Sequence, residues 1–139
     1  MTSQNDFNER IIAEFRANEG VAGGPFAGAP MLLLTTTGAK SGQRRTTPLV
    51  YLPDGDRWVI IASKGGAPQN PGWYHNLIAH PDVTIEVGTE TIPVTAREIR
   101  GTERDRLYAE QARLRPAFAE YQAKTSRKIP VIALERRNG

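Results

Sequence analysis

The chain contains no cysteine among its 139 residues. This absence excludes a disulfide framework, a thiolate metal site and a cysteine nucleophile, and it is compatible with a reducing compartment. Long apolar runs are lacking too, because stretches such as MLLL at 31–34 are far shorter than the ~20 residues of a membrane-spanning helix. The first ten residues lack the basic start and apolar core of a signal peptide, so we expect a cytoplasmic protein.

Histidine is scarce, and His75 and His80 are the only two. Five residues apart on a helix, they would point about 140° away from each other, and no acidic cluster adjoins them, so we expect no metal site. The net charge is +3, but Lys and Arg form no single stripe of the kind that binds nucleic acid, so we expect no such partner. A Ser–His–Asp arrangement is also absent, and any catalysis would therefore depend on a cofactor.

The length predicts a single domain spanning 1–139. Phe7, Ile11 and Phe15 recur every four residues and predict an amphipathic helix over about 4–18. Beyond this helix the pattern predicts strands over 31–37, 46–52 and 57–63, a short helix over 70–80, strands over 83–87 and 91–99, helices over 102–114 and 116–124, and a strand over 131–135. Strands do not alternate with helices, so a mostly antiparallel barrel or half-open barrel with helices is favoured over a doubly wound sheet.

Two turns rich in glycine and positive charge come directly after the first and third predicted strands. They read GAKSGQRR over 38–45 and SKGG over 63–66. The first and third strands of a meander run in the same direction, so we expect these turns to lie side by side and to bring Lys40 and Lys64 together. Glycine lets the backbone approach a phosphate closely, and cations neutralise it. The pattern indicates a site for a flat, anionic cofactor, with ordinary hairpin loops as the alternative.

The short helix after the second turn is predicted to have Asn70 as its N-cap and Pro71 at its first position, and its first turns carry Trp73, Tyr74 and Asn76. Its N-terminus would direct the helix dipole toward the cofactor, and Asn76 could offer both a donor and an acceptor to a heterocycle. Packing in the core is the alternative role for Trp73.

In this order the motifs resemble the deazaflavin-dependent nitroreductase family, which comprises small split-barrel oxidoreductases that use the 8-hydroxy-5-deazaflavin coenzyme F420. The matching pattern is LLLTT-x-G-x-KSGQ-x-R-x-x-PL, ASKGG and NP-x-WY-x-NL-x-A-x-P-x-V, found at 32–49, 62–66 and 70–83, and it continues at 121–122 and 127–130. The resemblance implies an α+β fold, a split β-barrel of about six mostly antiparallel strands with flanking helices. It also implies coenzyme F420 as the cofactor.

The resemblance assigns roles to individual residues. Lys40, Ser41 and Arg45 would hold the phosphate and acidic tail of the coenzyme. Those implied to line its tail and ring are Thr47, Pro48, Leu49 and Val50. Those implied to supply ring contacts and another cation are Ile61, Ala62, Ser63 and Lys64. Trp73, Tyr74 and Asn76 would close the site from the short helix.

The implied reaction is hydride transfer from reduced deazaflavin to a planar, electron-poor small molecule: a quinone, an enone or a nitro compound. Ser63 is the candidate to hydrogen-bond the ring or the acceptor, and Tyr121 is the candidate proton donor. Phe118 and Tyr121 lie three apart, on one face of a predicted helix, and could stack on the acceptor or pack in the core.

Several alternatives stay open at this point. The same barrel could bind FMN, or it could be a non-catalytic carrier of a flavin-like or lipidic ligand. The N-terminal helix could close over the acceptor site, make peripheral contact with a membrane, or simply pack on the barrel. A homodimer is a further option.

Overall fold

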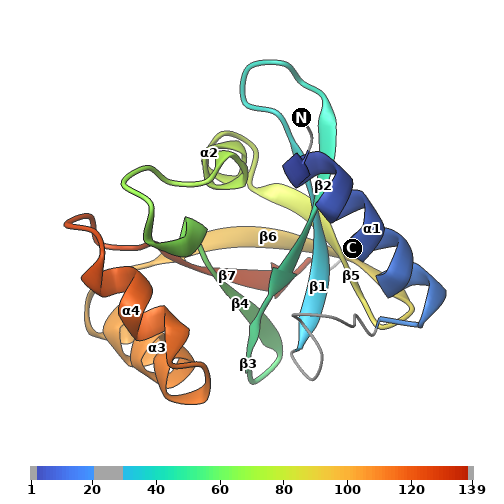
Figure 1. The fold of residues 1–139 in the computed structure, drawn as a ribbon. Coiled ribbons are helices and arrows are strands. Elements are labelled where there is room, and N and C mark those ends of the chain that lie inside the picture. Colours follow the sequence, from blue (N-terminus) through green and yellow to red (C-terminus); the bar gives the residue numbers. More distant parts are fainter. Residues whose placement is uncertain (1–2, 21–29, 138–139) are drawn as a thin grey trace.

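The computed structural model describes residues 3–20 and 30–137, with side chains described from Asn8 onward (Figure 1). Its helical elements are α1 (Ser3–Ala17), the 3-10 turn η2 (Lys64–Gly66), α2 (Gly72–Ala79), α3 (Gly101–Leu114) and α4 (Ala117–Ala123). Its strands are β1 (Met31–Thr37), β2 (Arg44–Val50), β3 (Leu52–Asp54), β4 (Arg57–Ile61), β5 (Asp82–Val87), β6 (Glu90–Ile99) and β7 (Val131–Arg136).

The strands form one curled sheet in which every neighbouring pair is antiparallel. Their order is β2-β1-β5-β6-β7-β4-β3. Strands β2 and β3 stand at opposite ends of this order, yet only Tyr51 separates them in the chain. The sheet therefore curls until its two ends meet at Tyr51. The expected split β-barrel is confirmed, and the predicted strand 46–52 is a single path bent at Tyr51 into two.

The interior of the barrel is an apolar cluster formed by alternate residues of β1, β4, β5, β6 and β7, with Leu49 of β2 packed against it. In β1, Leu32 and Leu34 face this interior, whereas Met31 and Leu33 pack toward α1 on the outside. All four side chains are buried because the strand is covered on both faces, which explains an unbroken apolar run where a half-exposed strand would alternate.

Helices α3 and α4 lie over a second outer face, formed by β4 and β7 (Figure 1). Val59 and Val131 belong to the cluster under these helices, whereas Ile60 and Ile132, their neighbours in sequence, face the barrel interior. Leu107 and Tyr108 complete this outer cluster from α3. The two strands nearest the helices are thus also buried on both faces.

Two local expectations, the cap of α2 and the end of the third predicted strand, are wrong, and hydrogen bonds from Arg127 are involved in both. Asn70 does not cap α2, because Pro71 occupies the N-cap and the Asn70 Oδ1 accepts a hydrogen bond from the Arg127 Nη1 at 2.7 Å. The third predicted strand ends at Ile61 rather than at 63. The carbonyl oxygens of Ala62 and Ser63 accept hydrogen bonds from Arg127 instead of continuing the strand.

Helix α1 packs on the outside of the barrel. Ile11 and Phe15 are buried against Met31 and Leu33 of β1. The Arg16 guanidinium adds a two-pronged ion pair to Glu86 of β5, with N–O distances of 3.0 and 2.7 Å. The described part of the apolar face of α1 is therefore occupied by the barrel, so peripheral membrane contact finds no support here. Within 3–20 and 30–137, no helix is long and apolar enough to cross a membrane.

We predict that Phe15→Ala lowers the free energy of unfolding by about 3–5 kcal/mol, because it leaves a cavity between α1 and β1. Urea denaturation followed by circular dichroism measures this loss. Arg10→Ala, at an exposed position of the same helix, is the matched control and should change stability by less than about 0.5 kcal/mol. Equal stability of Phe15→Ala and the wild type would contradict the packing role of α1.

Candidate functional site

The loop 38–43 between β1 and β2 is closed by its own hydrogen bonds. The Gly38 N–H donates to the Gln43 carbonyl at 2.8 Å, and the Gly42 N–H donates to the Gly38 carbonyl at 3.0 Å. Gly42 has a φ of +72°, in the left-handed region that glycine adopts without strain. A Cβ on Gly38 would lie 2.4 Å from the Ser41 Oγ. The backbone at Gly42 thus favours glycine, and a Cβ on Gly38 would require the Ser41 side chain to move.

Asn76 attaches this loop to α2. Its Nδ2 donates to the Thr36 Oγ1 at 3.1 Å, and its Oδ1 accepts from the Ala39 N–H at 3.0 Å. Thr36 is buried, so this hydrogen bond satisfies a hydroxyl that has little access to water. The amide that sequence reasoning directed at a cofactor heterocycle is here engaged with the protein, and it fixes the loop relative to the helix.

A cavity of about 760 Å³ lies between this loop, β2 and α2. Its volume is within the range of small-molecule and cofactor sites. Six residues proposed from the sequence line it: Lys40, Ser41, Arg45, Thr47, Trp73 and Asn76. Five lining residues were missed, namely Thr36, Gly38, Ala39, Gly72 and His75. Their only signal was adjacency to the chosen residues, since small residues and a lone histidine carry no pattern of their own.

The cavity is positively charged. Lys40 and Arg45 are exposed in its wall, and neither forms an ion pair with any residue that the structure describes. No Asp or Glu is among the described residues that line this cavity. The Ser41 hydroxyl adds a neutral hydrogen-bonding group. Unneutralised cations beside a glycine loop suit a phosphate or carboxylate, so the donors present fit an anionic, phosphate-bearing cofactor.

The other proposed coenzyme residues do not line this cavity. They are Pro48, Leu49, Val50, Ile61, Ala62, Ser63, Lys64 and Tyr74. Leu49 packs against the barrel interior and Val50 against the α1 cluster. Ala62 has no exposed surface and Ile61 is 8% exposed. A ligand contact at Ala62 therefore requires a local rearrangement, and the assignments of all eight stay predictions.

Tyr74 points its hydroxyl at β6. The hydroxyl donates to the Glu98 Oε1 at 2.7 Å. Burial raises the pKa of Tyr74 above its ordinary value, and the hydrogen bond to the Glu98 carboxylate raises it further. Tyr74 thus stays protonated, and its hydrogen bond joins α2 to β6 of the barrel.

The second basic turn lies against a different helix. A Cβ on Gly66 of η2, where φ is +84°, would lie 2.8 Å from the Tyr121 carbonyl oxygen of α4. The loop 38–43 is bonded to α2 instead. Lys64 is therefore exposed next to α4, and it does not share the cavity wall with Lys40.

The candidate acceptor residues belong to the outer cluster beneath α3 and α4. The rings of Phe118 and Tyr121 meet edge to face, with centroids 5.2 Å apart. The Tyr108 hydroxyl donates to the Phe118 carbonyl. Phe118 and Tyr121 are both half-buried, so each has packed and open surface. The proposed roles of Tyr121 as proton donor and of Ser63 as a ring or acceptor contact stay predictions.

Sequence reasoning assigned no role to Arg127, because in sequence it is one cation of a C-terminal group. In the structure its guanidinium reaches the segment 62–70 that carries Ser63 and Lys64. Burial lowers the pKa of this guanidinium from its ordinary value. Within the described ranges, no group of three or more His, Cys, Asp or Glu could hold a metal ion.

Comparison with known proteins places the chain. The F420H(2)-dependent quinone reductase Rv1261c of Mycobacterium tuberculosis (strain ATCC 25618 / H37Rv) is 47% identical over 131 residues, covering 90% of this chain and 87% of that protein. The solved structure of an F420-H2 dependent reductase, FDR-A, has a TM-score of 0.70 at 44% identity and covers 76% of this chain and 94% of the other. A second solved chain, described as a domain-swapped dimer, has a TM-score of 0.72 at 40% identity and covers 94% of this chain and 96% of the other.

The profile of one family matches nearly the whole sequence. It is described as F420H(2)-dependent quinone reductase, and it matches residues 9–136. This family implies coenzyme F420 as the cofactor, as the motifs do. The chain belongs to the F420H(2)-dependent quinone reductase family.

Proposed function

We propose that this chain is a reductase that uses reduced coenzyme F420 to reduce a quinone. The observation that carries the proposal is the cavity in which Lys40 and Arg45 have no carboxylate partner among the described residues. The description of the family, F420H(2)-dependent quinone reductase, names this reaction. The named function of Rv1261c and FDR-A supports the choice of coenzyme.

The cavity explains how the protein could hold such a coenzyme. Lys40, Ser41 and Arg45 would bind its anionic groups, and the backbone of loop 38–43 would approach them closely because Gly38 and Gly42 carry no side chain. Trp73 would pack against an apolar part of the ligand. When bound, reduced deazaflavin supplies a hydride, and a quinone that also takes up a proton becomes a hydroquinone. The protein contributes orientation rather than a nucleophile.

The finer parts of the proposal concern the acceptor and the assembly. We extend it to enones and nitro compounds, which are also planar and electron-poor. The half-buried rings of Phe118 and Tyr121 would contact the acceptor. A homodimer is included because a relative that is 40% identical is described as a domain-swapped dimer.

The first test identifies the ligand by fluorescence. The chain has two tryptophans, and Trp73 lines the cavity whereas Trp58 lies in β4. In a Trp58→Phe protein, Trp73 is the sole reporter. We expect F420 to quench it at micromolar concentration and FMN or NADPH to have little effect. Saturable quenching by FMN alone would favour the FMN alternative. Binding of F420 without oxidation of its reduced form by any quinone would favour a carrier.

The second test addresses the electrostatics of the cavity. We predict that Lys40→Ala and Arg45→Ala each weaken F420 binding roughly tenfold or more, because each removes a charged hydrogen-bond donor. Affinity of the wild type should also fall as salt rises. Arg44→Ala is the matched control, since Arg44 is exposed in the same strand but does not line the cavity. Titration of each variant with F420 measures the dissociation constant. Equal losses of affinity in all three variants would contradict a specific site.

The third test addresses the proton donor. We predict that Tyr121→Phe lowers kcat with a quinone by about tenfold or more while F420 affinity is unchanged, because only the hydroxyl is removed. Tyr108→Phe is the control, as its hydroxyl bonds a backbone carbonyl within the same cluster. Steady-state oxidation of reduced F420 measures kcat. An unchanged kcat in Tyr121→Phe removes Tyr121 from the reaction.

A further inference from the structure

One guanidinium organises the whole segment between β4 and α2. The Arg127 Nε donates to the Ala67 carbonyl at 2.9 Å, and its Nη2 donates to the Ser63 carbonyl at 2.8 Å. Its Nη1 donates to the Ala62 carbonyl at 3.2 Å and to the Asn70 Oδ1 at 2.7 Å. All four acceptors are neutral, and none of the ion pairs of the described residues involves Arg127.

Few backbone hydrogen bonds hold the segment, and at its start the Ala62 N–H donates to the Pro130 carbonyl at 3.0 Å. Its internal backbone hydrogen bonds are those of the 3-10 turn, from the Gly66 N–H to the Ser63 carbonyl at 2.9 Å and from the Ala67 N–H to the Lys64 carbonyl at 3.1 Å. Lys64 has a φ of +47°, in the left-handed region that a residue with a Cβ adopts at an energetic cost. Such a conformation persists only where the surroundings enforce it.

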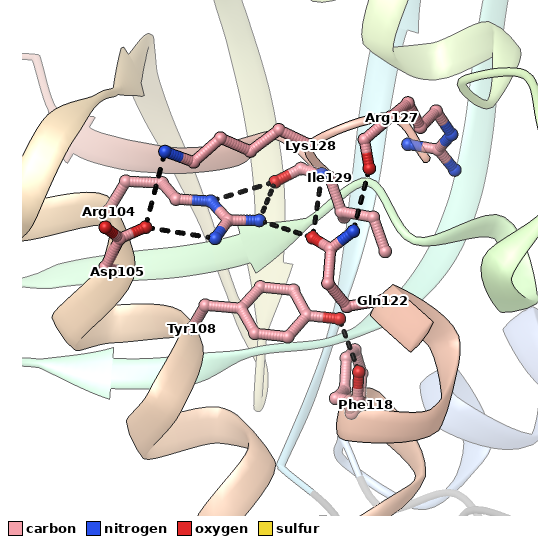
Figure 2. Close-up of polar contacts among 8 residues, drawn as sticks. All are labelled: Arg104, Asp105, Tyr108, Phe118, Gln122, Arg127, Lys128 and Ile129. Atoms are coloured by element: carbon pink, nitrogen blue, oxygen red, sulfur yellow. Dashed lines mark hydrogen bonds and ion pairs between the residues drawn. The ribbon is translucent and has the colours of Figure 1, made fainter. Parts of the chain in front are cut away.

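Arg127 is itself fixed in place by α3 and α4 (Figure 2). The Gln122 Nε2 donates to the Arg127 carbonyl at 2.7 Å, and the Gln122 Oε1 accepts from the Ile129 N–H at 3.1 Å. The buried guanidinium of Arg104 completes the cluster by donating to the Gln122 Oε1 at 2.8 Å and to the Ile129 carbonyl at 2.7 and 3.2 Å. The backbone that carries the Arg127 side chain is therefore anchored on both helices.

The opposite side of the segment is also confined. The contact of Gly66 with the Tyr121 carbonyl leaves no room for a Cβ, so η2 rests directly on the α4 backbone. Gln122, which holds the Arg127 carbonyl, is the next residue of the same helix. Lys64 thus stands on a short turn held between the Arg127 guanidinium and α4.

We propose that Arg127 is a positioning residue for coenzyme binding. By donating hydrogen bonds to the acceptors of 62–70, it holds Lys64 in the left-handed conformation. In this conformation Lys64 presents its ammonium group to an anionic group of the coenzyme. This inference rests on the proposed function and on the cation role that the motif ASKGG assigns to Lys64, which does not line the cavity of Lys40. The guanidinium acts through Lys64 and does not itself touch the coenzyme. Its unneutralised charge also adds to the positive potential of the site.

The test is a double-mutant cycle between Arg127→Met and Lys64→Ala, read as the dissociation constant for F420. Each single variant should weaken binding roughly tenfold. If Arg127 acts through Lys64, the double variant binds no more than about twofold more weakly than the weaker single variant, because the second change removes a group already displaced. Multiplied losses in the double variant, or wild-type affinity in either single variant, would overturn the proposal.

Two further variants sharpen the cycle. Arg106→Met removes the same charge from an exposed position of α3, and F420 affinity should stay at the wild-type value. A loss equal to that of Arg127→Met would show an effect of net charge and overturn the positioning role. If Arg127→Met fails to fold, Asn70→Ala replaces it in the cycle, since it deletes one acceptor of the guanidinium. We expect a roughly threefold loss that is not multiplied by Lys64→Ala, and multiplied losses would again overturn the proposal.

Amide hydrogen exchange without any ligand separates this inference from the proposed function. In Arg127→Met, exchange of the Gly66 and Ala67 amides should accelerate at least tenfold while the amides of β1 and β5 are unchanged. Unchanged exchange at Gly66 and Ala67 would overturn the positioning role of Arg127 even if the wild type binds F420. Failure of the wild type to bind F420 would instead overturn the proposed function, and with it the role of Lys64 toward the coenzyme.

Discussion

The continuity of β2 and β3 through Tyr51 is the constraint on which the rest of the structure depends. One chain segment pairs with β1 before Tyr51 and with β4 after it. Because these pairings lie at opposite ends of the strand order, the sheet must curl, and its interior is filled by apolar side chains. The two basic segments of the chain contact different helices. The loop after β1 meets α2, and the turn after β4 meets α4.

These two basic segments are stabilised by different chemistry. Loop 38–43 is closed by backbone bonds, and the neutral amide of Asn76 ties it to α2. Segment 62–70 instead depends on a single guanidinium that serves four neutral acceptors. A fork of donors on one planar group fixes several carbonyls at once, which a lysine ammonium at the same position could not match in geometry. The shape of the second segment is therefore sensitive to one side chain that lies about 60 positions later in the chain.

The sequence allowed the curled antiparallel sheet, the helices and six cavity residues to be predicted, because these rest on local patterns: apolar runs, turn residues and glycines beside cations. Its errors share a different origin. Asn70 was expected to cap a helix, yet its amide oxygen accepts from Arg127, which lies 57 residues away. Asn76 does line the cavity, but its amide oxygen also accepts from the Ala39 N–H, 37 residues away. Periodicity carries no information about such pairs. Nor could it show that Ala62, at the end of a strand, would be sealed in the interior.

The distribution of charge gives the site its chemical character. Arg16 and Arg97 are each paired with a glutamate on the barrel surface, and Arg57 is shared among Asp54, Glu103 and Glu135. Lys40, Arg45 and Arg127 have no such partner among the described residues, and they lie at the cavity or behind Lys64. Since a cation paired with a carboxylate projects little field, Lys40 and Arg45 contribute more positive potential at the cavity than the paired arginines contribute on the barrel surface. The cavity thus offers an anionic ligand two cations that have no carboxylate partner among the described residues.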